Sequence, residues 1–198
     1  MPVTINGDGS IAGLSVGGLG SGVVDTDTLA NGAATGAKQG AGSVIQVVQS
    51  STQTRTVINQ GTTFMDTGLS ATITPQFSSS KILIHAYHAV TFSNFAGNGD
   101  TGGWGLRLLR GNTVIKNGAS NGSDHYISVP SESSYIVFND PDSLSFLDTG
   151  PSGNGIGTTS AVTYKTQVNE SNSEINVTIN GNNGSNVSCE MILMEIKG

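Results

Sequence analysis

The chain has 198 residues, enough for one domain with a substantial core. Its 28 glycines and its low charged fraction of 11%, with Ser, Thr and Asn in place of charged residues, disfavour helices and suit short strands joined by turns. Eight scattered basic residues in a chain of net charge −6 argue against nucleic-acid binding, and no apolar run approaches the roughly 20 residues that span a membrane.

Residues 1–42 contain no aromatic residue and are dense in glycine, so they cannot form a core of their own. Short apolar pieces at 3–5, 11–16 and 23–24 could each add a strand to a neighbouring protein. A disordered tail is the alternative interpretation. The start of the chain lacks the pattern of a signal peptide, so we expect an attachment segment and no secretion signal.

Residues 43–198 carry apolar runs bounded by Gly, Asn, Asp, Ser or Pro, which is the pattern of strands and turns. Between 161 and 169, apolar and polar residues alternate as they do in a half-buried antiparallel strand. We predict no helix and eleven strands, near residues 43–49, 54–58, 69–73, 81–92, 104–110, 113–117, 125–128, 134–139, 161–169, 174–180 and 187–196.

These strands predict an all-β fold, an antiparallel β-sandwich of jelly-roll type, with residues 1–42 as an extended Gly-rich N-terminal segment. The runs 82–84 and 191–194 are apolar on both faces, so a strand there must be covered twice. One cover is the facing sheet, and we expect the other to be a neighbouring subunit. The candidate residues for a trimer interface are Ile82, Ile84, Ile192 and Met194.

Six segments of the domain and two of the leader are distinctive: 44–49, 66–75, 78–84, 104–110, 161–167 and 191–196, with 17–19 and 24–30 before them. Through the six domain segments, residues 43–198 resemble virion-associated C-terminal modules of phages of aquatic bacteria, which are described as tail-fibre or structural proteins. The two leader segments resemble stretches that precede such modules. The resemblance implies a location in the virion and trimeric assembly. Long fibres have an extended shaft that this sequence lacks, which favours a short fibre or a capsid decoration.

Two motif-like stretches do not support catalysis. Residues 13–17 match G-x-S-x-G, but no helix is predicted after the serine, as a nucleophile elbow requires. Residues 32–38 resemble a P-loop, yet Ala37 replaces the glycine before the lysine, and Gln39 replaces the magnesium-binding Ser or Thr. We predict no catalytic residues and a protein that is not an enzyme.

The enzymatic alternative is a polysaccharide depolymerase, which needs two carboxylates roughly 5–9.5 Å apart. Glu190 and Glu195 are the acidic residues predicted on a strand, and no acidic pair stands out. His85 and His88 point to opposite faces of a predicted strand, so they cannot bind one ion together, although a threefold axis could gather three copies of one histidine. Cys189 is predicted to be buried.

Asn and Asp gather at 6–8, 25–27, 98–100 and 139–142, where turn formation explains them and calcium binding is the alternative. We therefore predict no metal site and no cofactor. The Gly-rich loop 94–103 ends at Trp104, which either anchors the loop to the core or offers a stacking surface to a sugar. This loop and residues 117–124 give the candidate binding residues, Asn94, Asn98, Asp100, Trp104, Asn121 and Asp124.

Together these features predict a bacteriophage virion structural protein, a short tail fibre or appendage that contacts the host surface. A capsid decoration protein is the alternative, and the depolymerase ranks below both. The expected partners are two further copies of the chain, other virion proteins bound through residues 1–42, and a host surface glycan, with neither nucleic acid nor membrane insertion. The expected location is the virion, assembled in the bacterial cytoplasm.

Overall fold

The computed structural model describes residues 4–7, 11–12, 34–58, 61–94, 101–117, 125–128, 136–170, 175–180 and 187–198. The chain divides into two compact units, Met1–Gln39 and Gly40–Gly198. In the first unit, β1 (Thr4–Ile5) pairs antiparallel with β2 (Ile11–Ala12), and one 3-10 turn spans Gly36–Lys38. No helix in the described parts of the chain is long and apolar enough to cross a membrane.

The larger unit begins slightly before the predicted domain. The Gly42 N–H donates to the Lys197 carbonyl at 2.7 Å, and the Lys197 N–H donates to the Ser43 carbonyl at 2.9 Å. These bonds tie the entry of the chain to its C-terminal strand, so residues 40–42 belong with the sandwich.

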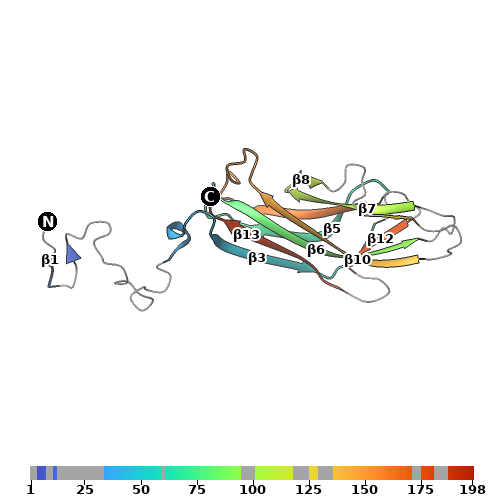
Figure 1. Ribbon diagram of the computed structural model, residues 1–198, viewed down its shortest axis with the longest axis horizontal. Helices are drawn as coiled ribbons and strands as arrows, with labels where there is room; N and C mark the ends of the chain where they lie inside the picture. The colour runs from blue at the N-terminus through green and yellow to red at the C-terminus, as the bar shows by residue number, and fades with distance from the viewer. Residues whose placement is uncertain are drawn as a thin grey trace. The chain divides into compact units, whose positions relative to one another are not determined.

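The larger unit is built from strands, and each predicted strand overlaps an observed one (Figure 1). The strands are β3 (Val44–Thr52), β4 (Thr56–Ile58), β5 (Met65–Ile73), β6 (Lys81–Asn94), β7 (Thr101–Arg110), β8 (Thr113–Asn117), β9 (His125–Ser128), β10 (Ile136–Asp148), β11 (Val162–Glu170), β12 (Ile175–Ile179) and β13 (Cys189–Ile196).

The antiparallel pairings are nested along the chain. β3 pairs with β13, β5 with β11, β6 with β10, and β7 with β8. These pairs assemble into a six-stranded sheet, in which β4 and β12 extend the β3-β13-β6-β10 order, and a five-stranded sheet, in which β9 joins β5-β11-β7-β8. The four nested pairs correspond to one long hairpin that is rolled up into two facing sheets, which is the jelly-roll arrangement. The predicted β-sandwich is confirmed.

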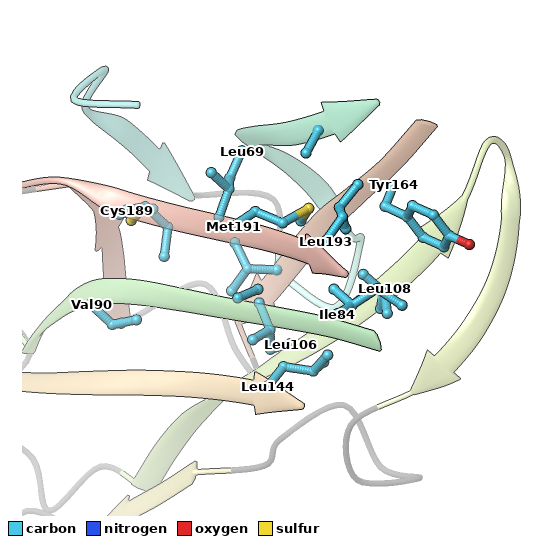
Figure 2. Packing of buried hydrophobic residues seen from close by; sticks show 14 of the residues in the cluster. Leu69, Ile84, Val90, Leu106, Leu108, Leu144, Tyr164, Cys189, Met191 and Leu193 are labelled. Carbon is cyan, nitrogen blue, oxygen red and sulfur yellow. The ribbon is translucent and has the colours of Figure 1, made fainter. Parts of the chain in front are cut away.

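Alternate residues of each strand fill the core between the sheets, because successive side chains of a strand point to opposite faces. In β13, Met191 and Leu193 point inward and are fully buried, as are Ile84 of β6 and Leu108 of β7. Figure 2 shows these side chains converging with Leu69 of β5 in one cluster. Burying each such side chain stabilises the fold by about 1.5–3 kcal/mol.

β10 runs nine residues past its predicted end, from Asn139 to Asp148, and passes through Pro141. The Asn and Asp residues at 139–142 were expected in a turn, and that expectation is wrong. A central strand donates backbone N–H groups to the strands on both of its sides. Proline has no N–H, so within sheets it is largely confined to edge strands. Among the described residues β10 pairs with β6 alone, and its other edge is therefore free to hold Pro141.

A buried ionic cluster joins the two sheets around Asp148, the last residue of β10. The Asp148 carboxylate accepts two bonds from Arg110 of β7, at 2.8 and 2.9 Å, and one from the Tyr164 hydroxyl of β11 at 2.9 Å. The Gly150 N–H donates to it as well, at 2.9 Å. The carboxylate is almost completely buried, so these four hydrogen bonds replace those to the water that it loses.

Glycine is required where two connections pack against each other beside this cluster. Gly150 and Gly155 have φ values of 76° and 113°, in the region that side chains disfavour. A Cβ on Gly150 would overlap the Gly155 carbonyl, and a Cβ on Gly155 would overlap the backbone of Ser79. The same connections are held by the Ile156 N–H, which donates to the Ser80 carbonyl at 2.8 Å.

The Asp148→Asn variant tests the ionic cluster. Loss of the carboxylate charge leaves the Arg110 guanidinium, whose side chain is 18% exposed, without its counter-ion, and we expect a loss of about 3 kcal/mol in the free energy of unfolding. Lys165→Ala is the matched control, because it breaks an exposed pair with Asp66 that contributes about 1 kcal/mol or less. Urea denaturation measures both, and equal losses would contradict the role of the cluster.

Candidate functional site on the outer face of the six-stranded sheet

The outer face of the five-stranded sheet is mainly polar, and among its described residues Val114 of β8 is the exposed large apolar side chain. The hydroxyls of Thr72 and Thr163 bond to each other at 2.8 Å, and the Lys165 ammonium lies 3.1 Å from the Asp66 carboxylate. Gln167, next along the same face of β11, donates to Asp66 at 2.6 Å. Side chains that bond to one another and remain partly exposed are suited to contact with water.

The outer face of the six-stranded sheet is different, because a row of apolar side chains crosses it. Met194 of β13 lies opposite Val47 of β3 on one side and opposite Leu83 of β6 on the other. Leu83 in turn lies opposite Leu147 of β10. Val47 is 59% exposed and Leu147 43%, while Leu83 and Met194 are half-buried. We call these four residues the apolar row.

A shallow hollow adjoins the apolar row on the same face. It is formed by the next two rows across the sheet and has a volume of about 220 Å³. Ile192, His85 and Ser145 make up the first row, and Glu190, Tyr87 and Ser143 the second. The Tyr87 side chain is 45% exposed, and the His85 Nδ1 atom lies 2.6 Å from the Ser145 hydroxyl. We call these six residues the Tyr87 hollow.

The structure separates the four candidate interface residues into two groups. Ile82 and Ile84 are fully buried in the core of their own chain, so neither can offer surface to another subunit, and that prediction is wrong for them. Ile192 and Met194 point outward and are half-buried, which leaves part of each available for contact. The difference follows from strand alternation, because Leu83 and not its two neighbours occupies the outer face.

Trp104 lies in the core, which is one of the two placements that its position after the loop predicted. The indole is 1% exposed and packs against Phe92, with the ring centroids 5.9 Å apart. Trp104 therefore anchors β7 to the core, and its interpretation as an exposed stacking surface is wrong. Asn94 is the last residue of β6, and the other candidate binding residues, Asn98, Asp100, Asn121 and Asp124, lie outside the described residues.

The strand end before the first predicted binding loop lies beside two other strand ends at one end of the sandwich. Asn94 at the end of β6 is in register with Ile136, where β10 begins, and with Ile175, where β12 begins. The opposite end of β6 lies beside the end of β13, close to Gly42 and Lys197. The chain therefore joins the sandwich, at Gly42, at the end of β6 opposite to Asn94.

His85 and His88 occupy opposite faces of β6, as predicted. His88 is fully buried and its Nε2 atom lies 2.8 Å from the Thr166 hydroxyl, which bonds to the Thr67 hydroxyl at 2.7 Å. Burial lowers the pKa of His88 to about 4, so the ring is neutral at pH 7. Among the described residues, no three metal-ligating side chains come together.

Other side chains with reactive groups are placed apart from one another. Cys189 is buried, as predicted, and burial raises the pKa of its thiol. Glu190 lies on the outer face of β13, whereas Glu195 points into the core and accepts the Gln76 N–H at 2.7 Å. The two glutamates on β13 therefore cannot flank one substrate bond.

The Tyr87 hollow did not stand out in the sequence. Lys81, Leu83, His85 and Tyr87 share one face of β6 by simple alternation, a signal that could have placed His85 beside Tyr87. The contributions of β10 and β13 could not be read in the same way, because strand order and register decide which residues lie opposite Tyr87.

No protein-family model matches this chain, and no curated protein matches its sequence.

The buried His88 predicts a loss of stability in weak acid. Its pKa is about 4 in the folded chain and about 6.5 in the unfolded chain, so the unfolded state binds the proton first as the pH falls. We expect His88 to account for a loss of roughly 3 kcal/mol in unfolding free energy between pH 6.5 and pH 4. Urea denaturation of the wild type and of His88→Gln across this range isolates the contribution of His88 to the unfolding free energy, because the variant keeps all carboxylates. Parallel pH profiles would contradict it.

Proposed function

We propose that this protein is a structural protein of a bacteriophage particle, a short tail fibre or appendage that assembles as a homotrimer. The observation that supports it best is the contrast between the two outer faces of the sandwich. A polar face is suited to water, whereas an apolar row across four strands is suited to contact with another protein surface. The resemblance of residues 43–198 to virion modules supports a phage particle and three subunits.

A second copy of the chain is the proposed cover of the apolar row. Covering the apolar row with a partner stabilises the assembly by about 25 cal/mol for each Å² of apolar surface that is buried. The row is flanked by Val44, which is 48% exposed, so the apolar surface continues along β3. Closed symmetric assembly repeats this contact in every subunit, so one modest surface stabilises the whole ring.

The leader is the proposed attachment to other virion proteins. Its described residues Thr4, Asn6 and Gly7 are exposed, and its strands β1 and β2 are only two residues long. The edges of a two-stranded sheet can pair with a strand of another protein, which is the basis of strand addition between proteins. The larger unit holds the whole hydrophobic core of the described residues, so attachment and folding are separate tasks in this proposal.

Mass measurement by light scattering tests the assembly. The intact protein at micromolar concentration should have about three times the 20.2 kDa mass of one chain. Val47→Asp places a charge in the apolar row at a side chain that is 59% exposed in the single chain, so the variant should fold but remain monomeric. Ser70→Asp, on the polar face, is the control and should stay trimeric. A monomeric wild type, or a trimeric Val47→Asp variant, would overturn the proposed interface.

Deletion of residues 1–39 tests the role of the leader. The shortened chain keeps the Gly42 to Lys197 bond and the entire described core, so it should melt cooperatively and keep the mass of the intact assembly. We expect it to be absent from phage particles when it replaces the full chain during infection, as measured by immunoblot of purified particles. Normal incorporation would show that the docking surface lies on the sandwich instead.

A further inference from the structure

We propose that the Tyr87 hollow binds a single neutral sugar ring. This inference rests on the proposed function, because it supplies the contact that an appendage makes with a host surface glycan. It also moves that contact from the predicted loops and Trp104 to the outer face of the six-stranded sheet.

The exposed aromatic ring is the first observation. Tyr87 lies in the middle of β6, where its neighbours Ala86 and His88 point inward and are buried. Its own side chain points outward and is 45% exposed, beside the apolar Ile192 wall of the hollow. An aromatic face offers apolar contact to the C–H groups of a sugar ring, and the phenol adds a polar edge.

The polar groups around Tyr87 are the second observation. Glu190 and Ser143 lie opposite Tyr87 on the two neighbouring strands, so a carboxylate and a hydroxyl flank the ring. In the next row His85 bonds through Nδ1 to the Ser145 hydroxyl, which leaves Nε2 as the second hydrogen-bonding atom of the imidazole. Sugar hydroxyls both donate and accept, so this mixture of acceptors and donors suits them.

Size and charge narrow the ligand to a neutral ring. The volume of about 220 Å³ is below the roughly 300–1,000 Å³ of sites for drug-sized ligands, so a single ring is enough to fill the hollow. Glu190 contributes a negative charge, and no lysine or arginine lines the hollow. In a chain of net charge −6, this arrangement disfavours phosphates and acidic sugars.

The hollow is built on three strands that are fixed by pairing along their length. β6 is hydrogen-bonded to β10 on one side and to β13 on the other at the level of Tyr87. A site on such strands needs little ordering when its ligand binds. Tyr87 is four residues from Leu83 of the apolar row, roughly 13 Å along the strand, so the two surfaces can be altered separately. Three copies in one assembly would convert weak contacts into firm attachment.

Saturation-transfer NMR on the full chain tests the proposal with free glucose, galactose, mannose and N-acetylglucosamine. We expect binding of at least one of them with a Kd on the order of 1 mM. Tyr87→Ala should weaken this binding at least tenfold, whereas Tyr87→Phe, which keeps the ring, should largely retain it. Val114→Ala, at an exposed aliphatic residue of the other sheet, is the matched control and should bind like the wild type. Glucuronic acid should bind only after Glu190→Gln.

The absence of saturation transfer to all four neutral sugars, or equal binding by the wild type and Tyr87→Ala, would overturn the sugar site. Light scattering on the same samples separates this outcome from failure of the proposed function. A trimer that binds no sugar overturns the hollow alone, and a monomer that binds sugar through Tyr87 overturns the assembly alone. If Tyr87→Ala is monomeric, the hollow is part of the subunit contact and the sugar site is wrong.

Discussion

Strand β6 is the constraint on which the rest of this molecule depends. It pairs along its whole length with β10, while its other edge pairs first with β13 and then with β12. Because successive side chains alternate, β6 contributes both to the core, through residues such as Ile84, and to the outer face, through Leu83 and Tyr87. The core and the candidate site therefore use opposite faces of one strand. A one-residue slip in register would move the core side chains of β6 to the outer face and the outer side chains into the core.

Local pattern was enough to predict each strand in the described part of the sandwich, since alternation and turn residues are properties of neighbouring positions. Predictions that depended on strand partners were less successful. Pro141 indicates a break when read alone, and only the edge position of β10 explains its place in a strand. Ile82 was assigned to a surface, and Trp104 was left between core and surface, because the sequence does not say which face of each strand is covered.

The proposed site has the same dependence on register. His85 and Tyr87 could be placed on one face from the sequence, but Glu190 and Ser143 come from distant parts of the chain and meet Tyr87 through pairing alone. The polar groups in the core also depend on contacts between distant parts of the chain. His88, Asp148 and Glu195 each bond to groups from other strands or connections, so the cost of their burial is offset by ties between distant segments.

The junction between β3 and β13 has a mechanical consequence. β3 is entered from the leader side, and it pairs with β13 through a ladder that runs from Val44 to Thr52. If the leader is anchored and the outer face is held by a ligand, tension draws β3 along its own axis. The ladder bonds are then loaded together in shear, and none can open before the others. A domain attached in this way would resist pulling far better than one whose end strand peels off bond by bond.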